Sequence, residues 1–167
     1  MDNLDFNKLW QNWLDTITKY YVDFNGRVDR MQFWYFVLVN VLIALAVAIV
    51  ASIIWAPALS RLYSLAVLLP SMGMGVRRLH DTGKPGLWIL IGFIPWGLIL
   101  VFGMFMLMGG MFGMMAILFV LMPILGLASL AAACVLIYLW IQPGQPEANQ
   151  YGPVPPVFEP GAPKPAV

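Results

Sequence analysis

The chain has 167 residues, of which 61% are hydrophobic and only 10% are charged, and its formal net charge is +1. Soluble domains usually carry about 25% charged residues. So little polar surface excludes an ordinary water-soluble globular protein, and a lipid bilayer is the expected environment.

The charges are distributed unevenly along the chain. Residues 85–146 contain no Asp, Glu, Lys or Arg. One transmembrane helix needs about 20 apolar residues, so this stretch is long enough for two. The single cysteine, Cys134, lies inside it and is expected to be a small buried hydrophobe. No cleavable signal peptide is expected, because the first 30 residues are polar and charged.

Residues 1–22 are predicted to form an amphipathic N-terminal helix. Apolar and aromatic side chains recur at helical spacing on one face, and polar side chains occupy the other. The apolar face consists of Phe6, Leu9, Trp10, Trp13, Leu14, Ile17, Tyr20 and Tyr21. Aromatic rings favour the membrane interface, so we expect an interfacial helix. The alternative is a helix that packs on the rest of the protein.

Residues 23–141 are predicted to form a domain of four transmembrane helices. The spans lie at about residues 33–55, 60–79, 87–108 and 114–141. Pro57 separates the first two spans, and Pro70 predicts a kink in the second. Proline recurs in residues 142–167, which predicts an extended, Pro-rich cytoplasmic tail. The predicted fold class is therefore an all-α membrane protein.

Basic residues flank the predicted spans asymmetrically. The segment before the first span and the loop between the second and third carry Lys8, Lys19, Arg27, Arg30, Arg77, Arg78 and Lys84. The opposite side has only Arg61. By the positive-inside rule, we expect a multi-pass protein of the bacterial inner (plasma) membrane with both termini in the cytoplasm.

Two polar motifs, Gly26–Arg30 and Arg77–Lys84, are expected to meet at the cytoplasmic face. The candidate site residues are Arg27, Arg30, Arg77, Arg78, His80, Asp81 and Lys84. One interpretation is a site for anionic lipid headgroups or an acidic partner, because arginine donates bidentately to phosphate. The other is a structural cluster in which Arg–Asp pairs join the helix ends. The structural interpretation is favoured, since basic flanks are expected of any inner-membrane protein.

No catalytic residue, metal site or cofactor is predicted. His80 and Asp81 have no serine or cysteine nucleophile near them in sequence. Zinc normally takes three or four ligands, and the chain has one His and one Cys. Thr82-Gly83-Lys84 lacks the first glycine of a phosphate loop, and Pro85 replaces its Ser/Thr. We therefore expect a protein that is not an enzyme.

The expected partners are the lipid bilayer and either anionic headgroups, a second copy of the chain or another membrane protein; no nucleic acid is expected. A small oligomeric transporter or channel subunit is the alternative function. Ionisable residues inside spans usually mark transport pathways, and the four predicted spans have none at mid-depth.

Three segments of the sequence resemble one known family. They are Tyr20–Arg27 with Arg30 and Phe33-Trp34, then Arg77–Lys84 with Gly86 and Trp88, and finally Gly144, Asn149, Tyr151-Gly152-Pro153 and Pro155. In this order they resemble the opening, central and closing motifs of the domain-of-unknown-function 805 family, which comprises small, YhaH-like bacterial inner-membrane proteins. The resemblance implies a multi-span inner-membrane fold and no established activity.

Overall fold

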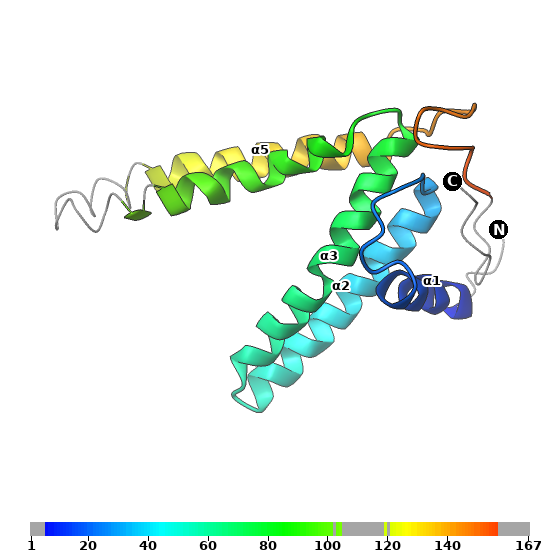
Figure 1. The fold of residues 1–167 in the computed structure, drawn as a ribbon. Helices are drawn as coiled ribbons and strands as arrows, with labels where there is room; N and C mark the ends of the chain where they lie inside the picture. The colour runs from blue at the N-terminus through cyan, green and yellow to red at the C-terminus, as the bar shows by residue number, and fades with distance from the viewer. Residues whose placement is uncertain (1–5, 102, 105–118, 120, 157–167) are drawn as a thin grey trace. The chain divides into compact units, whose positions relative to one another are not determined.

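The computed structural model describes residues 6–101, 103–104, 119 and 121–156 (Figure 1). Regular structure in these ranges is helical, without a β-strand. The all-helical class is therefore confirmed for the described part of the chain. The chain divides into two compact units, Met1–Gly86 with Pro143–Val167, and Leu87–Gln142.

The first unit is built on three helices. Helix α1 covers Phe6–Thr18, α2 covers Arg30–Ile53 and α3 covers Pro57–Asp81. Helices α2 and α3 lie side by side as a hairpin, and α1 packs across both (Figure 1). The Asp29 carboxylate caps α2 by accepting a hydrogen bond from the Met31 amide at 2.9 Å.

Helix α1 packs on the hairpin through a mixed face, in which the polar Asn12 and Thr16 are buried beside apolar side chains. Leu9 and Trp13 are buried, and the Trp13 indole N–H donates to Asn40 Oδ1 of α2 at 3.5 Å. Phe6 and Trp10, on the same predicted face, stay 70% and 39% exposed. The packed edge agrees with the alternative interpretation of this helix, while an interfacial position for its outer edge stays a prediction.

The second unit contains two apolar helices. The first is Gly86–Val101, and its first residue, Gly86, is counted with the first unit. It starts as the 3₁₀-helix η1, Gly86–Phe93. Helix α5 covers Met122–Ile141. A Cβ atom on Gly92 would lie 3.1 Å from Leu136 Cδ1, so the two helices pack closely.

Helices α2, α3 and α5 are long and apolar enough to cross a membrane, and Gly86–Val101 is a shorter apolar helix. The predicted spans 33–55 and 60–79 correspond to α2 and α3. Parts of the spans 87–108 and 114–141, at residues 102, 105–108, 114–118 and 120, lie outside the described residues. Three candidate spans are thus found in the described chain, and the fourth stays a prediction.

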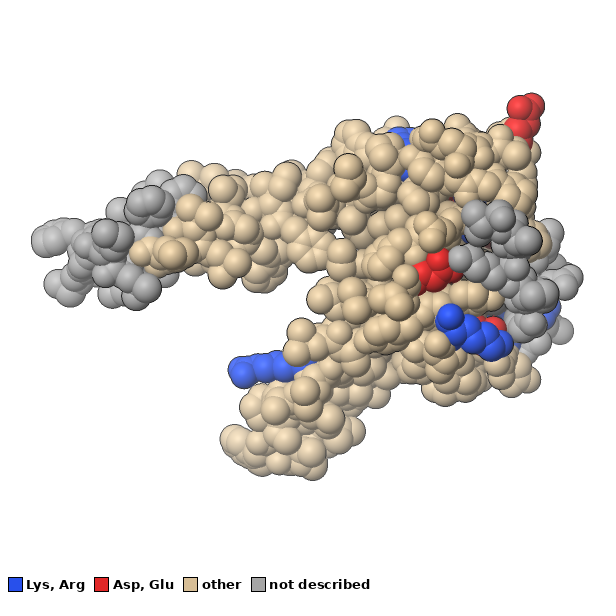
Figure 2. All heavy atoms as spheres, in the orientation of Figure 1, with Lys and Arg blue, Asp and Glu red and all other residues tan. Residues whose placement is uncertain are grey.

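The hairpin carries an apolar surface along the half that lies away from Arg30 and Asp81. Its large exposed side chains are Val41, Leu42, Leu45, Ile49, Val50 and Ile53 on α2, and Leu59, Leu62, Leu65 and Leu68 on α3. Figure 2 shows a face on which uncharged side chains predominate. An apolar surface this extensive is typical of contact with lipid or another protein.

Candidate functional site

The C-terminal end of α3 buries charged side chains. Arg77, Arg78 and Asp81 are buried there, and Arg27, from the loop before α2, is buried with them. Charged groups are rarely removed from solvent unless they are paired and hydrogen-bonded. The partners of these four residues therefore decide what the site can do.

The Asp81 carboxylate joins two guanidinium groups. Its Oδ1 accepts a hydrogen bond from Arg27 Nε at 3.0 Å, and Arg27 Nη2 lies 2.9 Å from the same oxygen as an ion pair. Its Oδ2 accepts from Nη1 of Arg78, one helical turn earlier on α3. We call Arg27, Arg78 and Asp81 the clasp, because they connect the loop before α2 to the end of α3.

The remaining donors of Arg27 bind backbone carbonyls of the C-terminal segment. Nη2 donates to Gln145 O at 2.6 Å, and Nη1 donates to Glu147 O at 2.7 Å and Gly152 O at 3.5 Å. A guanidinium has five N–H donors in a planar fork. Together with the bond from Nε to Asp81, every nitrogen of the Arg27 guanidinium donates within the chain.

Residues 143–152, here called the closing segment, return to the end of α3. The Gln145 amide donates to Asp81 O at 2.9 Å, and Asn149 Nδ2 donates to His80 O at 2.9 Å. The rings of His80 and Tyr151 stack, with centroids 3.9 Å apart and planes 2° apart. Residues 143–152 of the predicted tail are therefore docked over this stretch, which its proline content did not predict.

Two glycines permit this docking. A Cβ atom on Gly144 would collide with the Asp81 carboxylate, so only glycine allows the closing segment to pass this close. Gly83 follows α3 at φ +76°, a left-handed conformation that glycine adopts without strain, and a Cβ atom there would meet the Gln145 side chain. Both positions lie inside or beside the motifs that the sequence singled out.

The loop before α2 is held along α3 by further contacts. His80 Nδ1 lies 3.2 Å from Gly26 O, and the Val28 amide donates to Arg77 O at 3.2 Å. His80 thus touches both the loop and, through Tyr151, the closing segment. It acts here as a packing and hydrogen-bonding residue between two segments distant in sequence.

Arg77 belongs to a neighbouring environment. Its Nη1 lies 4.0 Å from Asp23 Oδ2, and its guanidinium carbon lies 5.6 Å from the Tyr20 ring centroid. It also donates to Met74 Sδ and to Gly73 O on its own helix. Arg77 therefore fixes the segment that leaves α1 against α3.

The structure brings together four of the seven predicted site residues, namely Arg27, Arg78, His80 and Asp81. Arg77 lies next to them with other partners. Arg30 is exposed at the start of α2, and Lys84 is half-buried beyond the end of α3. Sequence reasoning missed Gln145 and the other residues of the closing segment as partners; the family resemblance at Gly144, Asn149 and Tyr151 was the available signal.

Chemically, the site is a set of ion pairs whose charged groups are already hydrogen-bonded within the chain. Among the described residues, no group of three or more His, Cys, Asp or Glu side chains is arranged to hold a metal ion. His80 is engaged by a carbonyl and an aromatic ring. What the geometry does provide is a junction of three chain segments around one carboxylate.

The sequence of the chain matches a known protein family. The family model described as protein of unknown function (DUF805) matches residues 21–114, which is more than half of the chain. The chain belongs to the DUF805 family. Among its relatives is inner membrane protein YhaI of Escherichia coli (strain K12), 39% identical over 95 residues, covering 54% of this chain and 80% of YhaI. Inner membrane protein YhaH of the same strain is 35% identical over 100 residues, covering 54% of this chain and 83% of YhaH.

No solved structure was found to match the chain. The DUF805 match includes Arg27 and the Arg77–Asp81 motif but ends before the closing segment. The hydrogen bonds from Arg27 and Asp81 to that segment therefore add a third part to the site, beyond the residues that the family match covers.

Proposed function

We propose that this DUF805 protein is a non-enzymatic, multi-pass protein of the inner membrane, in which the clasp joins the helix ends to the closing segment at the cytoplasmic face. The observation that carries the proposal is the bonding of Arg27, each of whose three guanidinium nitrogens donates a hydrogen bond to a group of the same chain. The inner-membrane assignment rests on the relatives YhaI and YhaH, which are named as inner membrane proteins, and on the candidate spans.

These bonds favour a structural role over a ligand-binding role. A site that binds an anion must present donors to it, whereas every nitrogen of Arg27 already donates to Asp81 or to the docked closing segment. Arg78 is completely buried against Asp81. Anionic lipid headgroups would therefore meet the exposed Arg30 at the rim and not the clasp itself.

The same hydrogen bonds support a topology in which the start of α2, the end of α3 and the segment after α5 lie on one side of the membrane. Arg27 precedes α2, Asp81 ends α3, and Gln145 follows α5, yet the three residues are hydrogen-bonded to one another. A chain that starts and ends on one side of a membrane crosses it an even number of times. Two crossings by α2 and α3, and two by residues 87–142, satisfy this condition.

The proposed topology thus has four membrane spans. The Lys/Arg asymmetry assigns the clasp side to the cytoplasm, with both termini there. A reporter fused at Ser60 is expected to be periplasmic, and reporters after Lys84 and after Tyr151 cytoplasmic.

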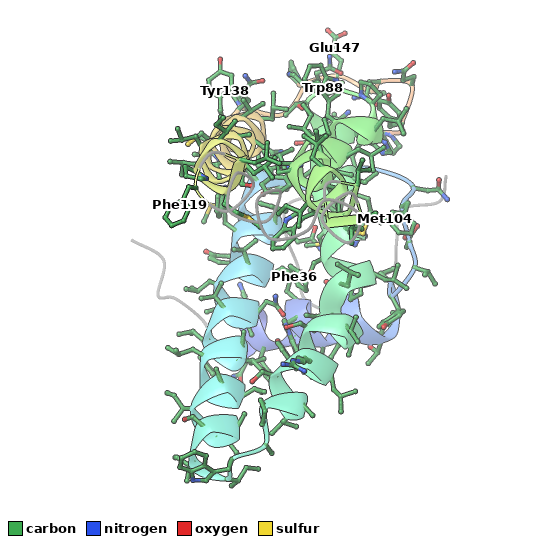
Figure 3. The ribbon with its side chains drawn as sticks, turned by 90° about the vertical axis from the view of Figure 1, so that its left-hand side faces the viewer. Phe36, Trp88, Met104, Phe119, Tyr138 and Glu147 are labelled. Atoms are coloured by element: carbon green, nitrogen blue, oxygen red, sulfur yellow. The ribbon has the colours of Figure 1, made fainter. Side chains whose placement is uncertain are left out.

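Docking of the closing segment onto the clasp can be measured by protease cleavage at a natural site. Glu147 is exposed, and Figure 3 shows its side chain pointing away from the ribbon, while its carbonyl is held by Arg27. The only other glutamate, Glu159, is followed by Pro160, and a glutamate-specific protease cuts poorly before proline, so cleavage after Glu147 is readily followed.

In detergent, Arg27→Ala should speed cleavage after Glu147 by about tenfold or more, since losing 1.4 kcal/mol of docking free energy changes the undocked fraction tenfold. Arg30→Ala is the matched control and should leave the rate unchanged. An unchanged rate in Arg27→Ala, or faster cleavage of the wild-type chain when phosphatidylglycerol is added, would overturn the structural role and favour an anion site.

A further inference from the structure

The turn between α2 and α3 carries a tryptophan in a conformation that favours glycine. Trp55 has φ +54°, and among the described residues it is the only non-glycine residue with a positive φ. A bulky residue in this left-handed region is a genuine outlier. The conformation therefore needs a reason.

The hydrogen bonds around Trp55 form a Schellman motif. The Ala56 amide donates to Ala51 O at 2.9 Å, and the Trp55 amide donates to Ser52 O at 3.4 Å. These bonds satisfy the last carbonyls of α2 and place Trp55 at the position after the helix where glycine is usual. Pro57 then begins α3, so the backbone of this turn is fixed from both sides.

The Trp55 side chain gains little from its own chain, because it is 90% exposed. Its neighbours Ile53 and Ile54 are exposed as well. An indole combines a large apolar ring with one N–H donor, and such rings concentrate at the headgroup level of membranes. The exposed apolar surface of the hairpin ends at this residue, as a lipid-facing surface does at the headgroups.

Length and charge point to the same layer. Helix α2 has 24 residues, and at 1.5 Å per residue it is about 36 Å long, enough to cross a hydrocarbon core of about 30 Å. Arg61 is exposed in the second turn of α3. Its cationic side chain complements a phosphate, and its long stem lets the charge extend toward the headgroups.

We propose that Trp55 and Arg61 form an anchor for phospholipid headgroups on the side of the membrane opposite the clasp. The indole lies among the glycerol and carbonyl groups, and the guanidinium contacts a headgroup phosphate. This inference rests on the proposed crossing of the membrane by α2 and α3, and it adds the depth at which the hairpin sits.

A depth measurement tests the anchor. In a Cys134→Ser background, which has no other cysteine, a nitroxide is attached at Ile54→Cys, which keeps the neighbouring indole, at Leu45→Cys in mid-α2, or at Ala148→Cys in the closing segment. In vesicles of phosphatidylethanolamine and phosphatidylglycerol, accessibility to oxygen and to a water-soluble nickel chelate reports depth. Leu45 should read deep, Ala148 aqueous, and position 54 at headgroup level.

The outcomes separate the two proposals, because depth in vesicles does not depend on which face is cytoplasmic. A position 54 as deep as Leu45, or as aqueous as Ala148, would overturn the anchor alone. An aqueous Leu45 would overturn the crossing itself and the anchor with it.

A second measurement isolates the indole. With the nitroxide at Ser60→Cys, Trp55→Gly should shift the label's depth while Trp55→Tyr, which keeps an amphipathic ring, should not. In detergent, Trp55→Gly should unfold at a higher temperature than Trp55→Ala, because glycine alone relieves the backbone strain. Equal label depths in the glycine and tyrosine variants would overturn the anchoring role of the side chain.

Discussion

The α2–α3 hairpin has two ends that can be compared directly. At the clasp end, α3 is buried from Gly73 to Leu79 and again at Asp81, and the buried side chains include charged ones. Toward Trp55, large apolar side chains such as Leu45 and Leu62 are exposed. Within one pair of helices, burial therefore follows the availability of partners and not hydrophobicity.

The comparison shows how two kinds of surface are stabilised in such a chain. Where the proposed bilayer surrounds the helices, apolar contact with lipid replaces contact with protein, so the hydrophobic effect gives no preference for helix association. Cohesion must then come from packing and polar contacts. At the clasp end these are supplied by segments from three parts of the chain, around Arg27, Asp81 and Gln145.

The largest expected effect comes from removing the shared carboxylate. Asp81→Ala leaves Arg27 and Arg78 buried without their counter-charge, and breaking a buried pair in this way costs about 3–5 kcal/mol of unfolding free energy. Denaturant titration of the full chain in detergent measures the loss. The control is Asp15→Ala, which removes an ion pair to the exposed Lys19.

Asp15→Ala should change the stability far less, since Lys19 stays exposed to water and is not stranded as a buried charge. Comparable losses in the two variants would mean that the clasp is solvated and that the two ends of the hairpin do not differ as described.

A matched pair of apolar truncations sharpens the comparison. Met74 is completely buried at the clasp end, and Met74→Ala should cost about 2–5 kcal/mol, because it removes packing and leaves a cavity. Leu45 is 57% exposed toward Trp55. Leu45→Ala should cost much less in the same detergent titration. The reverse order would show that the exposed surface of α2 is covered by protein.

A smaller effect is expected from a close backbone approach. A Cβ atom on Gly73 would lie 2.8 Å from Asp23 O, so Gly73→Ala should destabilise the chain by about 1–3 kcal/mol through overpacking. Gly126, inside α5, has open space around it, and Gly126→Ala should be neutral or stabilising. Equal thermal unfolding temperatures for the two variants would show that the loop before α2 is not packed on α3.

Helix positions could be predicted from sequence, because apolar length and proline placement are local signals. The predicted span 33–55 corresponds to α2 at Arg30–Ile53, and 60–79 corresponds to α3 at Pro57–Asp81. The candidate site was predictable only as a set of residues. Which arginine meets Asp81 depends on how the loop before α2 turns, and composition carries no signal for that.

The contacts of the closing segment could not be predicted from the sequence. Arg27 binds backbone carbonyls there, and a carbonyl carries no residue identity that a motif could reveal. Proline content predicted an extended tail, whereas the docking depends on contacts with residues more than 60 positions away. Trp55 is similar, since a left-handed backbone at a non-glycine residue has no sequence signal.

A double-mutant cycle on the unfolding free energy in detergent shows whether Arg27 and Asp81 act as one structural unit. If they do, Arg27→Ala costs less in an Asp81→Ala background than in the wild-type chain, with a coupling of about 1–3 kcal/mol. The same cycle with Arg30→Ala should be additive. Strict additivity for Arg27 as well would contradict the clasp.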